Sequence, residues 1–112
     1  MKFETLDVWK RSAALASQVY TELAELKDFG FKDQITRSCL SISSNIAEGW
    51  ERDSNREKQR FLNIAKGSAA EFLSQTYIGR KIEYIPSDVG KHWQQEASEI
   101  AAMIASLAKK FD

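Results

Sequence analysis

The sequence predicts an all-α protein, a single antiparallel four-helix bundle with up-down-up-down topology. Apolar residues recur at steps of three and four in four successive segments, which is typical of the buried side of amphipathic helices. Only five glycines and one proline occur in 112 residues, too few for the many turns of a β fold. This length suits one domain covering residues 1–112, and short connections place sequential helices antiparallel.

The first helix is expected from about Thr5 to Asp28. Asp7 is the candidate N-cap, with Thr5 as the alternative, and Gly30 marks the expected stop. A heptad-like apolar stripe, widened by two further residues, predicts the side that faces the core: Leu6, Trp9, Ala13, Ala16, Tyr20 and Leu23, with Val19 and Leu26.

The second helix is expected from about Lys32 to Glu51 and is dense in serine. Serine is a mediocre helix former because its hydroxyl competes for backbone hydrogen bonds. The prediction therefore depends on the apolar stripe, which again has steps of three and four: Phe31, Ile35, Cys39, Ile42, Ile46 and Trp50.

The third helix is expected to start at Ser54, where a serine with Glu57 three residues later forms a capping-box pattern. It continues to about Tyr84, and the single proline then ends it. The fourth helix starts at Ser87 or Asp88, both good caps. Their stripes are Phe61, Ala65, Ser68, Phe72 and Thr76, and Val89, Trp93, Ala97, Ile100, Ile104, Leu107 and Phe111.

The charge balance and the single cysteine restrict the functional classes. Sixteen basic and sixteen acidic residues give a formal net charge of zero. Nucleic-acid-binding proteins usually carry an excess of basic residues, so this balance argues against that function. Cys39 alone can form neither an internal disulfide nor a cysteine-based metal site, and no metal or cofactor is predicted. No apolar run is long enough to cross a membrane and no secretory signal is recognisable, so the cytoplasm is the expected compartment.

A strip of polar residues runs beside the apolar stripe of the second helix and has a partial match on the third. Arg37 is expected to pair with Glu71 across the two helices. The strip could be an active site, but we favour a hydrogen-bond network that fixes helix register, either within the bundle or between subunits. Its members are Gln34, Arg37, Ser41, Asn45, Glu48, Ser68 and Glu71.

Catalysis is not expected, and no catalytic residue is assigned. Glu48 and Glu71 could be paired carboxylates, but the Glu-x-x-His spacing of the di-iron bundles is missing. The only histidine, His92, would need ligands from elsewhere to bind a metal. Cys39 lies on the apolar stripe, where a buried thiol behaves as a small hydrophobic group.

A basic edge surrounds the start of the third helix. Its residues could contact phosphates, although interleaved acidic residues favour a solvated face. The basic edge consists of Arg52, Arg56, Lys58, Arg60 and Lys66.

Two segments carry a resemblance to a known family. Residues 34–49, Gln-Ile-Thr-Arg-Ser-Cys-Leu-Ser-Ile-Ser-Ser-Asn-Ile-Ala-Glu-Gly, resemble the signature of bacterial four-helix-bundle proteins first noticed in ribosomal-RNA intervening sequences, the S23 family. Residues 61–71 match its second signature, and residues 3–10 look like its usual start. The small polar pair Ser38-Cys39 departs from the family's small apolar residues, a change that core packing could absorb.

The resemblance implies a ring-shaped homopentamer. The family is also similar to the accessory protein of diversity-generating retroelements, which binds a reverse transcriptase and nucleic acid. Those accessory proteins look markedly basic, whereas this chain is neutral. We therefore expect a non-catalytic oligomeric interaction or scaffold protein, with itself and a protein or ribonucleoprotein such as a reverse-transcriptase complex as partners. The alternative is direct RNA or DNA binding through the basic edge.

Overall fold

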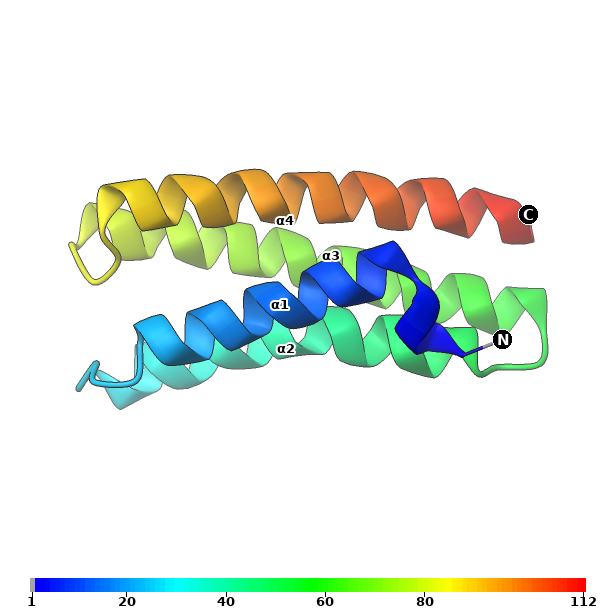
Figure 1. The fold of residues 1–112 in the computed structure, drawn as a ribbon, viewed down its shortest axis with the longest axis horizontal. Helices are drawn as coiled ribbons and strands as arrows, with labels where there is room; N and C mark the ends of the chain where they lie inside the picture. Colours follow the sequence, from blue (N-terminus) through cyan, green and yellow to red (C-terminus); the bar gives the residue numbers. More distant parts are fainter. Residues whose placement is uncertain (1) are drawn as a thin grey trace.

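Four long helices form an antiparallel bundle in the computed structural model, which describes residues 2–112 (Figure 1). The chain runs up and down in sequence order, so both termini lie at the same end of a body measuring 42 × 21 × 20 Å. The elements are the 3-10 helix η1 (Phe3–Thr5), the helices α1 (Asp7–Glu22), α2 (Phe29–Trp50), α3 (Asn55–Lys81) and α4 (Ser87–Ala108), and the 3-10 helix η2 (Lys109–Phe111). The predicted four-helix fold is confirmed, and residues 2–112 contain no strand.

The core forms where the apolar sides of all four helices meet. The predicted stripes of α2 and α4 supply most of it, with Ile35, Ile42 and Ile46 from α2 fully buried. Phe72 of α3 packs against Trp93 of α4 with ring centroids 6.1 Å apart. Burial of such large side chains is the main source of stability in a domain of this size.

The first helix is shorter than predicted. It ends at Glu22 instead of near Asp28, and Gly30 lies inside the first turn of α2 instead of stopping α1. Asp28 causes this difference because its carboxylate accepts a hydrogen bond from the backbone N–H of Phe31, at 3.1 Å, and thereby caps α2 several residues early.

The predicted core stripe of α1 is right only in part, because Ala16, Val19 and Leu23 are buried as predicted. The structure also buries Val8, Ser12 and Leu15, which the predicted stripe left out, whereas Tyr20 is 46% exposed. This helix carries two apolar stripes about a quarter-turn apart, and periodicity alone does not say which of them faces the core. Trp9, Ala13 and Tyr20 of the predicted stripe lie instead along the side of the bundle next to α2, where they line a hollow between α1 and α2.

The start of α3 agrees with its capping pattern, but its end does not agree with the prediction. The Ser54 hydroxyl accepts a hydrogen bond from the N–H of Glu57 at 3.1 Å. The helix then ends at Lys81, before Tyr84, because Glu83 adopts a left-handed conformation with φ of 66°. The amides of Tyr84 and Ile85 turn back to the Gly79 carbonyl at 2.9 and 3.1 Å, which leads the chain directly into α4.

Every helix within residues 2–112 is too short or too polar to span a lipid bilayer.

Candidate interaction surfaces

The centre of the predicted polar strip joins α2 to α3. The hydroxyls of Ser41 and Ser68 lie 2.9 Å apart, and the Asn45 amide donates to the Ser41 carbonyl at 2.8 Å and to its hydroxyl at 2.9 Å. A contact that the sequence did not indicate lies nearby, where Ser38 donates to the side-chain oxygen of Gln75 at 2.6 Å. Small polar side chains therefore allow α2 and α3 to approach closely while their hydroxyls remain hydrogen-bonded.

The ends of the strip do not form the predicted network. Arg37 pairs with Asp33 on its own helix at 3.0 Å instead of with Glu71, because a carboxylate four residues away is reached without crossing between helices. Glu48 pairs with Arg52 at 2.5 Å and lines a shallow hollow. Neither Arg37 nor Glu71 contributes to the lining of that hollow. Gln34 and Glu71 are exposed. The outer part of the strip is thus an open surface of the single chain.

Intramolecular contacts occupy much of the basic edge. Arg60 pairs with Glu57 at 3.5 Å, and Lys58 donates to the Trp50 carbonyl at 2.7 Å. The guanidinium groups of Arg52 and Arg60 lie 4.7 and 5.1 Å from the ring centre of Phe61. Within residues 2–112, the side chains of Arg56 and Lys66 make no hydrogen bond or ion pair. Few of the predicted basic side chains are therefore free to bind phosphates.

An apolar groove runs between α1 and α2. Three large apolar side chains remain uncovered on it, since Tyr20 is 46%, Leu40 is 45% and Phe29 is 69% exposed. The groove consists of two adjoining hollows of about 790 and 510 Å³ that share Tyr20. Trp9 and Ala13 from the second stripe of α1 line the smaller hollow. Uncovered apolar surface of this kind marks interaction sites in many proteins.

A second apolar surface lies on α3 and projects outward. Ile64, Ile78 and Ile82 share one side of this helix at steps of fourteen and four residues, and they are 41%, 51% and 48% exposed. We call this surface the α3 ridge. The sequence carries a signal for this surface, because these three isoleucines lie outside the predicted buried stripe of the third helix.

Aromatic pairs close the two ends of the bundle. Phe31 and Tyr84 pack edge to face at 5.3 Å, and Trp50 and Phe111 do so at 5.8 Å. The Tyr84 hydroxyl also donates to Asp28 at 2.9 Å. Hydrogen bonds from the Phe31 amide and from Tyr84 lower the pKa of the Asp28 carboxyl. These contacts connect the α1–α2 loop to the α3–α4 loop.

Cys39 is fully buried in the core, and desolvation raises the pKa of its thiol to about 12. Because the thiolate is the reactive form, we expect the native protein to resist iodoacetamide at pH 8 and to react completely in 6 M guanidinium chloride. A Cys39→Ala, Ser98→Cys variant, which carries its thiol at an exposed position of α4, is the matched control and should react at once. Native Cys39 reacting as fast as this control would contradict the buried position. Mass spectrometry over time measures both rates.

No group of three or more histidine, cysteine, aspartate or glutamate side chains that could hold a metal ion occurs within residues 2–112. His92 is exposed and lines an open groove between α1 and α4.

The fold and these surfaces define a helical-bundle protein with uncovered apolar surface on two sides. The chain belongs to the 23S rRNA-intervening sequence protein family, whose model matches residues 4–106. It is similar to the crystal structure of a protein with unknown function from the S23 ribosomal protein family of Bacteroides thetaiotaomicron VPI-5482. The two chains are 29% identical with a TM-score of 0.85, and the match covers 91% of this chain and 98% of the other. No curated protein matches the sequence. The resemblance inferred from the two sequence signatures is confirmed.

Proposed function

We propose that this protein is a homo-oligomeric interaction module that acts by binding and not by catalysis. Its subunits assemble into a ring, and the ring serves a protein or ribonucleoprotein partner. The observation that carries the proposal is the pair of uncovered apolar surfaces, the α1/α2 groove and the α3 ridge. A monomer of 12.7 kDa has little reason to expose the six large apolar side chains of these two surfaces to water unless another surface covers them.

The shapes and positions of the two surfaces favour a ring. The groove is hollow and lies between α1 and α2, whereas the ridge projects from α3, so a ridge on one subunit can enter the groove of the next. Contact between two different surfaces is heterologous. When it is repeated from subunit to subunit, it produces a closed ring if the successive rotations add up to one full turn. Five subunits is the number that the family resemblance implies.

The polar strip has a role in this arrangement. Its exposed members are Gln34, Arg37, Glu48 and Glu71, and Glu71 lies between Ile64 and Ile78 on the same side of α3, where it would border the apolar contacts. Polar side chains at the rim of an interface fix register and orientation more than they add affinity. The formal net charge of zero also minimises repulsion between identical subunits.

Charge substitutions on the two surfaces test the assembly. Leu40→Glu in the groove and Ile78→Glu on the ridge should each convert the oligomer to a 12.7 kDa monomer, because each buries a carboxylate against apolar surface. The two variants mixed together should form a dimer of twice the subunit mass, since one intact groove and one intact ridge remain. Light scattering coupled to size-exclusion chromatography measures the masses.

A glutamate at an exposed position of α4, Ser98→Glu, is the matched control and should leave the oligomer unchanged. Circular dichroism of all three variants verifies that they remain folded. A wild-type protein that is monomeric at micromolar concentration would refute the proposal. An Ile78→Glu protein that still forms dimers by itself would show that groove meets groove, which excludes the ring.

A further inference from the structure

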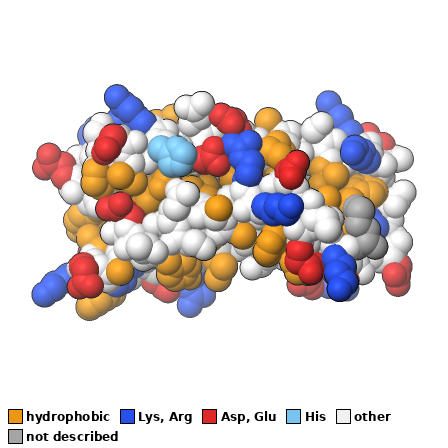
Figure 2. Space-filling view, viewed as in Figure 1, with side chains coloured by type: hydrophobic (Ala, Val, Ile, Leu, Met, Phe, Trp, Pro, Cys, Tyr) orange, Lys and Arg blue, Asp and Glu red, His pale blue; other side chains and the backbone are white. Residues whose placement is uncertain are grey.

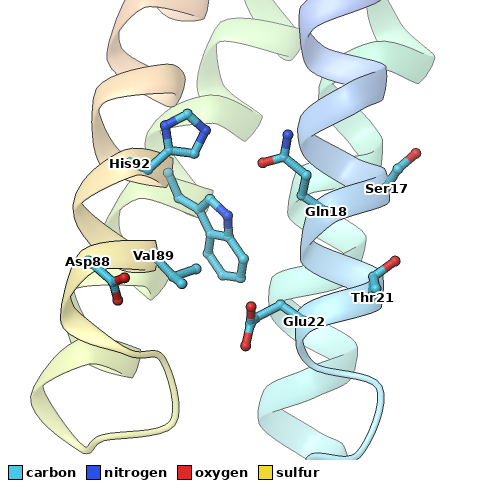
Figure 3. A pocket seen from close by; sticks show the side chains of 8 residues that line it. Ser17, Gln18, Thr21, Glu22, Asp88, Val89 and His92 are labelled. Carbon is cyan, nitrogen blue, oxygen red and sulfur yellow. The ribbon is translucent and has the colours of Figure 1, made fainter.

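A second groove, between α1 and α4, has a different chemical character from the apolar one. It is open on one side, has a volume of about 730 Å³, and lies near the end of the bundle where α1 stops. Gln18 and Glu22 extend from α1 toward α4, and Val89 extends from α4 toward α1, whereas Ser17 and Thr21 point away (Figure 3). Asp88, His92 and Trp93 of α4 complete the lining. We call it the acidic groove.

Both carboxylates of the acidic groove are without a cationic partner within residues 2–112. Asp88 lies in the first turn of α4, where the helix dipole favours a negative charge. Glu22 is the last residue of α1, where the dipole disfavours it. The fold therefore gains nothing from the charge of Glu22 at this position, and a cation bound from outside would compensate it.

Trp93 supplies a polar atom that the bundle itself does not use. Its side chain is buried, with 1% exposure, and lines the acidic groove. Its indole N–H makes no hydrogen bond to another group of residues 2–112, and it is not one of the fully buried polar atoms left without a partner, so it is open to the groove. Trp93 and Val89 together offer an apolar floor with one unused hydrogen-bond donor.

The acidic character continues along the same side of the bundle. Arg11 pairs with Glu96 at 2.6 Å and with Glu99 at 2.7 Å, which leaves one net negative charge on the three side chains. The Arg11 guanidinium also lowers the pKa of the Glu99 carboxyl. In Figure 2, which shows this side of the molecule, acidic side chains lie on both sides of the single histidine. Acidic side chains therefore continue along α4 from the groove, partly neutralised by Arg11.

We infer that the acidic groove binds an arginine or lysine side chain of a basic segment in a partner polypeptide. The methylene stem of the basic residue packs on Trp93 and Val89, its charged end lies between Glu22 and Asp88, and a backbone carbonyl accepts from the indole N–H. An open groove buries too little of a free amine, whereas an extended segment gains a second ionic contact farther along α4. The inference does not depend on ring assembly, because the groove uses neither the α1/α2 groove nor the α3 ridge.

The spacing along α4 defines a probe peptide. Asp88 and Glu96 are eight residues apart, which is about 12 Å along a helix. An extended chain covers about 3.3 Å per residue, so two basic residues four positions apart match this separation. The probe is an acetylated and amidated heptapeptide of glycine and alanine with arginine at its second and sixth positions. Its citrulline counterpart keeps the shape and removes the charge.

Titration of the full-length, ¹⁵N-labelled protein with this peptide tests the inference. The indole N–H signal of Trp93, assigned by its loss in Trp93→Phe, should shift during the titration, and raising the salt concentration should weaken binding. We expect at least tenfold weaker binding for the Glu22→Gln, Asp88→Asn variant and for the citrulline peptide. The Glu51→Gln, Asp53→Asn variant has the same net charge, with both changes at the other end of the bundle, and should bind like the wild type.

Several results would overturn the inference. These are an unchanged Trp93 signal, equal losses in both charge variants, or spermidine binding as tightly as the peptide, which would assign the groove to free amines. A Trp93 shift that follows protein concentration without peptide would place a second copy of the chain in the groove. Light scattering on the same samples reports the oligomeric state independently of peptide binding. An intact oligomer without peptide binding contradicts only the groove inference, and a monomer that binds the peptide contradicts only the proposed ring.

Discussion

Replacement of Gly49 by alanine is expected to destabilise the bundle by about 1–3 kcal/mol, the usual effect of overpacking a tightly filled contact. Gly49 is buried near the end of α2, where α2 meets the start of α3. An added Cβ would lie 2.8 Å from the Cβ of Phe61 and 3.2 Å from the carbonyl oxygen of Lys58. Both atoms belong to or directly adjoin the α3 backbone, so neither can move aside by a simple rotamer change. Urea denaturation measures the loss.

Gly67→Ala provides the matched control within the next helix. Its added Cβ would have no neighbour within 4 Å, and the residue is exposed in the interior of α3. The same substitution should therefore stabilise the protein by about 0.5–1 kcal/mol through helix propensity. Both variants are compared at one protein concentration, because the stability of an oligomer depends on concentration. Equal effects at the two positions would contradict the close approach of α2 and α3.

The sequence predicted α2 and α4 better than α1 for a physical reason. Ile35, Ile42 and Ile46 form one apolar stripe on α2, and only one rotation of the helix buries it. In α1, the stripes of Leu15 and Tyr20 compete, because both have helical spacing. The deciding factor is the position of α2 and α4 around α1, which depends on tertiary packing and is not contained in the periodicity of one segment.

The interaction surfaces were predictable only in part, again because side-chain partners depend on distances between helices. Helical spacing placed Ser41 and Asn45 on the side of α2 that meets Ser68, and these three side chains lie together. The same spacing also places Asp33 four residues before Arg37, a local partner that the expected pair with Glu71 did not take into account. Glu22 and Asp88 come from distant parts of the sequence, and only the packing of α1 beside α4 places them around one groove.

Phe72→Ala and Phe29→Ala should separate the core from the proposed assembly surface. Phe72 is fully buried against Trp93, so its truncation leaves a cavity in the core and should reduce the free energy of unfolding by about 3–5 kcal/mol. Phe29 is 69% exposed beside the apolar groove, where the single chain buries little of the ring. Its truncation should change the stability of a monomeric background such as Leu40→Glu by less than about 0.5 kcal/mol.

The same two substitutions should have the opposite order of effects on assembly. A ridge that packs into the groove covers Phe29, and aromatic side chains contribute strongly to interface energies. Phe29→Ala should therefore lower the oligomer fraction at a given concentration while the bundle itself stays folded. Phe72→Ala should change assembly only where it unfolds the subunit, as circular dichroism would report. If Phe29→Ala left both the melting temperature and the oligomer mass of an otherwise wild-type protein unchanged, the groove beside Phe29 would not be the assembly surface.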